Sequence, residues 1–367
     1  MGGTSSHGQR LADRRFNVPS VNLSFPRVLA SLLLGLSLVA LSGCGGSKHS
    51  AKPPESTPAS LAPNSIAFWD AEHGLVGSGI TWKKTTGAIS ATSDGGKTFH
   101  VVLRTPEPVV WVSVVADTQN AWAQLRSSRL LHSSDYGRTW RTLPRSSPQP
   151  LYPNIALTVV QPRCPNLRGP CPVPAVLSLG LATTTTGRLL KTWNGGQTWK
   201  VLPSPGSTLK YEWGAPLGPT YLSLTSRHAW ALRVGQGSAG SEPKTVFESA
   251  DGGKSWRMVA DQPVVGHSRV GSGGLASYGY PQGISFSPQG TGLLWESRGN
   301  LYGTRDGGHR WQKLAVAEPE VDSGLSAVML SRTGAFVLLM RPDGYRLLTT
   351  TDGGESWSIV HRWAAAR

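Results

Sequence analysis

The stretch Ser249-Ala250-Asp251-Gly252-Gly253-Lys254-Ser255-Trp256 returns in near-copies along most of the chain. The other copies keep Asp or Asn at the third position and an aromatic residue at the last, and they span 92–99, 133–140, 192–199, 304–311 and 350–357. The steps from one Asp or Asn to the next are 41, 59, 57, 55 and 46 residues. A repeat of this length is typical of a propeller built from four-stranded blades.

Each copy has the chemistry of a self-contained turn. An Asp or Asn side chain accepts hydrogen bonds from backbone N–H groups two or three residues on, and the glycines allow the positive φ of a tight hairpin. The aromatic residue then covers the turn with apolar surface. We therefore interpret the copies as structural elements. Their polar positions are Asp94, Asp135, Asn194, Asp251, Asp306 and Asp352, and their aromatic positions are Phe99, Trp140, Trp199, Trp256, Trp311 and Trp357.

A second pattern precedes most of these turns, and it completes a four-stranded unit. An apolar strand, a polar turn and another apolar strand occur, for example, in 65–76 and 113–123. A third strand leads into the Asp-Gly-Gly turn and a fourth leaves it. The sequence thus predicts an all-β propeller of six blades within 64–363, at about 64–105, 108–145, 153–203, 219–260, 282–315 and 325–363. A seventh, degenerate blade in 204–219 or 261–282 is the alternative, although neither stretch has room for four strands.

The N-terminal 43 residues have the features of an export signal. Basic residues precede an apolar run from Val28 to Leu41, which is short for a membrane span. The following Leu41-Ser42-Gly43-Cys44 resembles the bacterial lipobox, whose Cys is acylated and becomes the mature N-terminus. The resemblance implies a lipid-anchored protein on the extracytoplasmic face of the cell membrane, with 45–63 as a flexible Pro- and Ser-rich tether. An ordinary signal peptide with an incidental Cys44 is the alternative.

The two remaining cysteines lie close together in the sequence. Cys164 and Cys171 are separated by six residues, and outside the cytosol we expect them to form a local disulfide. Free thiols are the alternative. Metal binding is disfavoured because the stretch contains no His and no second pair of cysteines. We expect neither a metal nor a cofactor.

The chain is basic, with a formal net charge of +15 from 36 Lys and Arg and 21 Asp and Glu. Removal of 1–43, which hold four Arg and one Asp, leaves a net charge of +12. Such a charge attracts anionic partners, namely lipid headgroups, acidic polysaccharide or acidic protein faces, or it serves solubility alone. Nucleic acid is disfavoured, because the chain is expected to be exported and carries no known nucleic-acid module.

The repeated turns resemble the Asp-box, or bacterial neuraminidase repeat. Together with strand phrases such as Phe68-Trp69-Asp70-Ala71-Glu72-His73-Gly74-Leu75, they are similar to the photosystem II stability/assembly factor-like group of exported propellers. The resemblance covers about 64–363 and implies the fold. It is unspecific for function, since Asp-box propellers include sialidases, other glycoside hydrolases, sortilin-type receptors and non-catalytic assembly factors.

The expected binding face is the one opposite the Asp-Gly-Gly turns, around the central channel. Two long connections between blades, 203–220 and 261–282, supply aromatic and cationic residues to that face. The candidate binding residues are Lys210, Tyr211, Trp213, His267, Arg269, Tyr278 and Tyr280. The alternative is that these aromatic residues only cap the ends of blades.

The leading functional hypothesis is a non-catalytic scaffold that binds a protein or an anionic cell-surface polymer at the membrane. The alternative is an exo-sialidase or related glycoside hydrolase. A sialidase-like site would need clustered arginines, a Tyr nucleophile and acidic partners, and the chain lacks the Arg-Ile-Pro phrase of that family. Glycosidases also need two carboxylates about 5–10 Å apart. The carboxylates left free on the expected face are few, and nothing in the sequence pairs two of them: they are Glu107, Glu212, Glu242, Asp261, Glu318, Glu320, Asp322 and Asp343.

Overall fold

The computed structural model describes residues 62–79, 86–144, 147, 150–152, 155–160, 177–205, 220–226, 228–238, 240–262, 272–316 and 323–365. Cys44, Cys164, Cys171, Lys210, Tyr211, Glu212, Trp213, His267 and Arg269 lie outside these residues, as do the predicted signal and most of the predicted tether. In the described part, no helix is long and apolar enough to cross a membrane.

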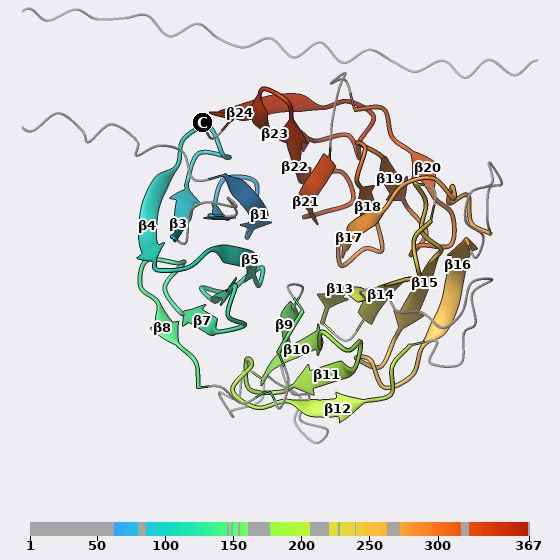
Figure 1. The fold of residues 1–367 in the computed structure, drawn as a ribbon, viewed down its shortest axis with the longest axis horizontal. Coiled ribbons are helices and arrows are strands. Elements are labelled where there is room, and N and C mark those ends of the chain that lie inside the picture. Colours follow the sequence, from blue (N-terminus) through green and yellow to red (C-terminus); the bar gives the residue numbers. More distant parts are fainter. Residues whose placement is uncertain are drawn as a thin grey trace, which may run out of the picture. The chain divides into compact units, whose positions relative to one another are not determined.

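The strands form six four-stranded antiparallel sheets, which are the blades of a propeller (Figure 1). Blade 1 contains β1 (Pro63–Phe68), β2 (Gly74–Ser78), β3 (Gly87–Thr92) and β4 (His100–Thr105). Blade 2 contains β5 (Val109–Val114), β6 (Ala121–Leu125), β7 (Leu130–Ser133) and β8 (Arg141–Thr142). Blade 3 contains β9 (Ala156–Val160), β10 (Leu177–Thr183), β11 (Leu189–Thr192) and β12 (Lys200–Leu202).

The other three blades repeat the same order of strands. Blade 4 contains β13 (Thr220–Thr225), β14 (His228–Val234), β15 (Lys244–Ser249) and β16 (Arg257–Gln262). Blade 5 contains β17 (Pro281–Phe286), β18 (Gly292–Glu296), β19 (Leu301–Thr304) and β20 (Gln312–Lys313). Blade 6 contains β21 (Ser323–Met329), β22 (Ala335–Arg341), β23 (Gly344–Thr350) and β24 (Ser358–Ala364). Six blades confirm the predicted architecture, and the strands begin and end within one residue of the predicted 64–363.

In every blade the strands pair in sequence order, with the first strand nearest the centre of the ring and the fourth at its rim (Figure 1). Strands that are neighbours in a blade also follow each other in the chain, so each blade is a simple meander. The Asp-Gly-Gly turns join the third strand to the fourth, as the sequence predicts. Residues on the first strands therefore line the centre, and most of those on the fourth strands are at least partly exposed at the rim.

The apolar core lies between neighbouring blades. At the junction of blades 4 and 5, buried Trp230 stacks on Phe286 with ring centroids 4.1 Å apart and an interplanar angle of 6°. Val246 and Leu294 belong to the same buried cluster. Each blade buries its faces only against its neighbours, which is the general reason that such repeats are stable as a closed array.

The ring closes between blade 6 and blade 1 without a strand shared by the two ends of the chain. Phe68 of β1 stacks on Phe336 of β22 with centroids 3.8 Å apart. The backbone N–H of Ile66 donates to Ser326 Oγ at 3.2 Å. At the rim, His361 Nδ1 lies 2.9 Å from the carbonyl oxygen of Lys97. Side-chain contacts thus join the two terminal blades.

Candidate functional site

The Asp-Gly-Gly turns are held by a recurring hydrogen-bond pattern. In blade 1, Asp94 Oδ1 accepts from the backbone N–H of Thr98 at 3.0 Å, and Asp94 Oδ2 accepts from the Thr98 hydroxyl at 2.6 Å. Thr92 Oγ1 accepts from the N–H of Gly96 at 2.9 Å. The Asp therefore accepts from the N–H four residues on, one residue beyond the expected reach of two or three. Two successive glycines at positive φ, 74° and 84°, carry the chain through this wider loop. In the blade 4 turn the expected bond is present as well, since Asp251 Oδ1 accepts from the N–H of Lys254, three residues on, at 2.9 Å.

The polar side chains of these turns form hydrogen bonds that hold the turns together. The bonds from Thr98 hold the pKa of Asp94 below its usual range, and the bonds from Thr139 lower the pKa of Asp135 to about 2. The turns also receive bonds from the preceding blade. The indole N–H of Trp122 donates to the carbonyl oxygen of Gly195 at 2.9 Å, and that of Trp230 to Gly307 at 3.0 Å.

Hydrogen bonds place the Asp-Gly-Gly turns and the turns between first and second strands on one face. The N–H of Gly95 donates to the carbonyl oxygen of Glu72 at 2.9 Å, and the N–H of Gly353 donates to that of Thr333 at 2.8 Å. We call this side the turn face. The connections between second and third strands lie on the opposite face, because each strand carries the chain from one face to the other.

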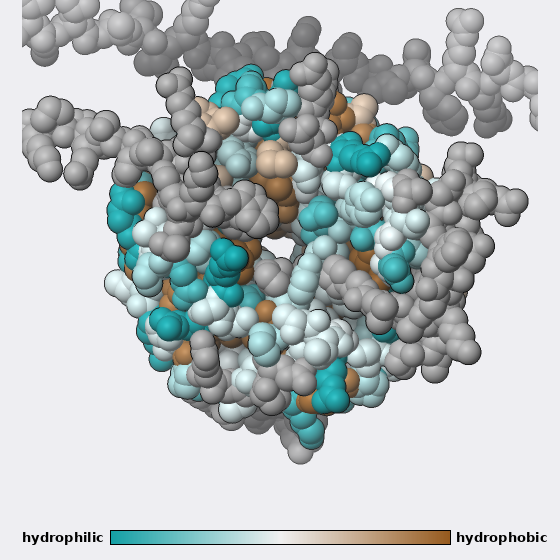
Figure 2. Space-filling model, viewed as in Figure 1, coloured by the Kyte–Doolittle hydropathy of each residue, from teal (hydrophilic) through white to brown (hydrophobic). Residues whose placement is uncertain are grey.

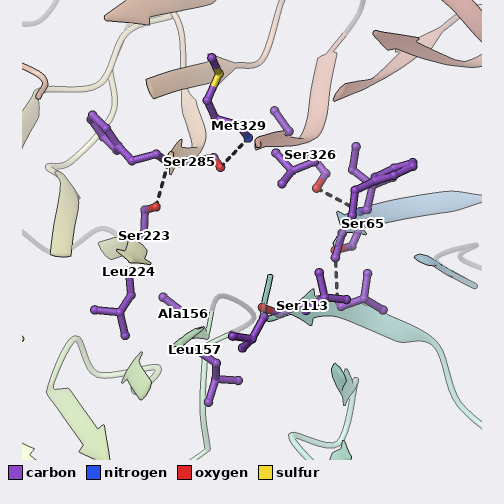
Figure 3. Close-up of a pocket in the computed structure, with 18 of the residues that line it drawn as sticks. Ser65, Ser113, Ala156, Leu157, Ser223, Leu224, Ser285, Ser326 and Met329 are labelled. Atoms are coloured by element: carbon purple, nitrogen blue, oxygen red, sulfur yellow. Dashed lines mark hydrogen bonds between the residues drawn. The ribbon is translucent and has the colours of Figure 1, made fainter. Parts of the chain in front are cut away.

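The central channel is a cavity of about 560 Å³ bounded by the innermost strands, and it opens in the middle of the face shown in Figure 2. Its wall is mainly apolar side chains and hydroxyl groups (Figure 3). Several of the hydroxyls bind the next blade, as in the 2.9 Å bond from the Phe286 N–H to Ser223 Oγ and the 3.0 Å bond from the Met329 N–H to Ser285 Oγ. These hydroxyls are part of the framework.

The channel does not offer the groups that a sialidase-like site needs. Asp117 is the only ionisable side chain among the described residues of its wall. An arginine cluster and a pair of carboxylates are therefore missing from the described lining. This argues against the exo-sialidase alternative at the channel.

A polar site lies instead at the junction of blades 4 and 5, on the face opposite the turn face. The hairpin between β14 and β15, the segment 277–280 and the turn between β18 and β19 meet there. Backbone bonds join them: the N–H of Glu242 donates to the carbonyl oxygen of Gly279 at 3.2 Å, and the N–H of Ser297 donates to that of Tyr280 at 2.9 Å. The three segments therefore form one hydrogen-bonded platform.

Exposed aromatic and cationic side chains cover this platform. Tyr278 is 51% exposed, and the guanidinium of Arg298 lies 4.9 Å from its ring centroid and 6.0 Å from that of Tyr280. Arg298 also donates to the hydroxyl of Tyr278. Stacking on two rings orients a guanidinium while leaving part of its edge free for a ligand. No ion-pair partner of Arg298 occurs among the described residues.

Buried charges lie behind the exposed rings. Lys244 forms an ion pair with Glu296, and both side chains are fully buried. The amide of Asn300 donates to the second carboxylate oxygen of Glu296 at 3.1 Å. Since both oxygens of Glu296 are engaged and shielded, this carboxylate is unavailable to a ligand.

Glu242 is the accessible carboxylate of the site. It is half-buried, and no described residue donates a hydrogen bond to its side chain. Burial raises the pKa of Glu242 to about 7, with Lys244 opposing the shift and Glu296 adding to it. A ligand that donates hydrogen bonds would find an unoccupied acceptor here. We call Glu242, Lys244, Tyr278, Tyr280, Glu296, Arg298 and Asn300 the blade 4–5 site.

The sequence-based candidates map onto this site only in part. Tyr278 and Tyr280 lie in it, whereas the other five candidate binding residues lie outside the described part. Asp261 is on the outermost strand of blade 4, where its Oδ1 accepts from the Thr245 hydroxyl at 2.7 Å. Sequence reasoning missed Lys244, Glu296, Arg298 and Asn300. These four residues lie in or beside the connections between the second and third strands of blades 4 and 5, and that position was the available signal.

The site is suited to binding and not to the chemistry of paired carboxylates. Glu242 is its only accessible carboxylate, since Glu296 is enclosed. Within the described ranges, no group of three or more His, Cys, Asp or Glu is placed to hold a metal ion. A stacked guanidinium, exposed rings and a carboxylate without a hydrogen-bond partner are groups that recognise a polar partner surface.

No family model and no curated protein matches the chain. Solved structures with a similar fold include YCF48 bound to D1 peptide, at 18% identity and a TM-score of 0.45 over 83% of this chain and 82% of that one. Another is YCF48 from Cyanidioschyzon merolae, at 16% identity and a TM-score of 0.45 over 83% and 86%. A GH74 xyloglucanase from Xanthomonas campestris has 16% identity and a TM-score of 0.49 over 82% of this chain and 47% of that one. At sequence identities this low, the similarity to these structures shows the fold alone.

Proposed function

We propose that the protein is a lipid-anchored binding scaffold on the extracytoplasmic face of the cell membrane, and that it holds a partner protein at the blade 4–5 site. An anionic cell-surface polymer is the other partner class that a basic chain accommodates. Cys44 would carry the lipid, and 45–63 would tether the propeller to it. The observation that carries the proposal is the pairing of exposed Tyr278 with Arg298, which has no ion-pair partner among the described residues.

The composition of the site supports binding to a protein. Tyr and Arg are the residue types that contribute most at protein interfaces, because they bury a large area and still form hydrogen bonds. Arg298 is already oriented by two rings, so a partner pays little side-chain entropy when it binds. The rigid sheets on both sides keep this surface in place.

Affinity capture from the native membranes tests the proposal. The anchored protein is expected to retain a partner that the double variant Tyr278→Ala and Arg298→Ala retains at least tenfold less, since two central interface side chains are removed. Arg104→Ala, an exposed substitution on β4, is the matched control and should capture as much as the wild type. Equal capture by the double variant would place the partner elsewhere on the molecule.

A hydrolase assay addresses the enzyme alternative. The purified protein is expected to leave sialylated and other glycans intact. Hydrolysis that disappears on substitution of Asp261, Glu212 or Glu242 would move the protein to the glycoside hydrolases.

The anchor and the disulfide have separate tests. Cys44→Ala should release the protein from membrane fractions, and retention would contradict the lipid anchor. Mass spectrometry without reduction should find Cys164 linked to Cys171, whereas two free thiols would contradict the disulfide.

A further inference from the structure

Most of the net positive charge of the chain comes from one continuous stretch of the sequence. Residues 136–211 contain nine Lys and Arg but no Asp or Glu. This stretch holds a net charge of +9, out of +12 for everything beyond residue 43. It includes all four strands of blade 3 and the last strand of blade 2. Five of these nine cations, Arg138, Arg141, Arg188, Lys191 and Lys200, lie among the residues that the structure describes.

Three of these cations lie close to the turn face at the rim of the ring. Arg138 is within the Asp-Gly-Gly-like turn of blade 2, Arg141 opens β8, and Lys200 opens β12. All three side chains are exposed. The corresponding turn of blade 3 has Asn194 where other blades have Asp, so it adds no negative charge. Asp135, in the turn of blade 2, is the nearest carboxylate in the sequence.

Large apolar side chains are exposed on the same two blades. Tyr136 is 44% exposed, Trp193 is 41% exposed and Val201 is 51% exposed. Trp193 lies beside the amine of Lys191, which is 5.2 Å from its ring centroid. We call Tyr136, Arg138, Arg141, Trp193, Lys200 and Val201 the cationic edge. It holds three cationic and three large apolar side chains.

Tyr136 occupies an unfavourable backbone conformation. Its φ is 59°, at the position where the other five turns have glycine with φ between 65° and 80°. A bulky residue in the left-handed region costs about 1–2 kcal/mol. Its ring contacts Trp69 edge-on, with centroids 5.5 Å apart, and close to half of the residue stays exposed. A strained backbone under a side chain that is only partly buried points to a use for the exposed part of the ring.

We propose that the cationic edge binds the propeller to an anionic phospholipid surface. Cations attract the headgroups, and exposed aromatic and aliphatic side chains between them enter the interfacial region. The inference rests on the membrane anchor of the proposed function, because the 19 residues of 45–63 would keep the domain within reach of a bilayer. This constant proximity favours lipid over an acidic protein, which the edge would have to find by diffusion.

Binding through this edge has a geometric consequence for the scaffold. The cationic edge is on the turn-face side of blades 2 and 3, and the blade 4–5 site is on the opposite face. A propeller bound to lipid through the edge therefore keeps its partner site away from the bilayer.

Vesicle sedimentation tests the proposal on the chain from residue 45, which differs from the expected mature protein only by the acylated Cys44. At low salt this chain should bind vesicles of 30% phosphatidylglycerol in phosphatidylcholine, and it should not bind pure phosphatidylcholine. Binding should disappear at about 0.5 M NaCl, where charges are screened within a few ångströms. The triple variant Arg138→Gln, Arg141→Gln and Lys200→Gln should bind about a hundredfold more weakly, since each cation near the surface contributes about fivefold.

A matched triple variant controls for net charge. Arg104→Gln, Lys313→Gln and Arg362→Gln remove three exposed cations from the outermost strands of blades 1, 5 and 6. Binding should change less than threefold. Tyr136→Gly adds a second readout: it should weaken binding without lowering the free energy of unfolding, because glycine relieves the strained φ.

Three results would overturn the proposal: no binding to the anionic vesicles, equal loss in the two triple variants, or binding of soluble poly-L-glutamate through the same three cations without any vesicle binding. The last result would assign the edge to an acidic protein. Partner capture through Tyr278 and Arg298 does not depend on these cations, so the failure of one proposal is distinguishable from the failure of the other.

Discussion

The hydroxyl of Ser65, on the innermost strand of blade 1, accepts a 3.1 Å hydrogen bond from the backbone N–H of Val112 on the innermost strand of blade 2. The same contact recurs around the channel, with Ser326 bound by Ile66 and Thr158 by Ser226. A hydroxyl of the first strand thus links one blade to the next.

Ser65→Ala should lower the free energy of unfolding by about 1–3 kcal/mol, because the buried N–H of Val112 loses its acceptor. Urea denaturation at pH 7 measures the change. Ser113→Ala is the matched control, since no described residue is hydrogen-bonded to the Ser113 hydroxyl, and it should change stability by less than about 0.5 kcal/mol. Equal effects of the two variants would mean that the hydroxyl contact does not hold the blades together.

The buried pair of Lys244 and Glu296 leads to a second prediction. Lys244→Met alone or Glu296→Leu alone should destabilise the protein by about 3–5 kcal/mol, since each leaves a buried charge without its partner. The double variant should recover most of that loss, because no unpaired charge remains. A double-mutant cycle from thermal or urea unfolding measures the coupling. Additive losses would show that the two side chains act independently.

Glu242 makes stability depend on pH. Its pKa is raised to about 7 in the folded protein, so the folded state binds the proton more tightly than the unfolded chain does. The resulting stabilisation is present below the unfolded pKa of about 4.5 and is lost as the pH rises through 7. Glu242→Gln should therefore flatten the decline in stability between pH 4.5 and 7, as followed by urea denaturation across this range. An unchanged decline would mean that another group carries it.

The blade 3 turn, which has Asn194 where the other turns have Asp, suggests a prediction for the Asp-Gly-Gly turns. Asp251→Ala should destabilise by about 1 kcal/mol, as loss of a capping acceptor does, because Asp251 accepts from the N–H and hydroxyl of Ser255. Asp251→Asn should cost less, because Asn194 makes the corresponding bond to the Thr198 N–H at 2.9 Å. Thermal unfolding compares the two variants. A larger loss for Asn than for Ala would contradict the role of the side-chain oxygen.

Features of this protein that depend on interactions between residues close together in the sequence could be predicted. Features that depend on contacts between distant residues could not. The turn around Asp251 was predictable because its donors and acceptors lie within a few residues, and its repetition revealed the number of blades. Even there, the prediction fell one residue short: Asp251 accepts from the N–H of Lys254, three residues on, as expected, and also from the N–H of Ser255, four residues on, since two left-handed glycines widen the loop. Tyr278 and Tyr280 were found as aromatic residues in a long connection, without their neighbours.

The sequence by itself determined the fold class and the face that the Asp-Gly-Gly turns occupy, and it favoured six blades over seven, because these follow from short-range hydrogen bonds and the alternation of strands. Only the tertiary structure decided which side chains meet between blades. Lys244 and Glu296 are 52 residues apart, and their contact depends on the packing of blade 4 against blade 5. The pKa of Glu242 depends on the same packing, since burial is a property of the assembled ring and no local pattern encodes it.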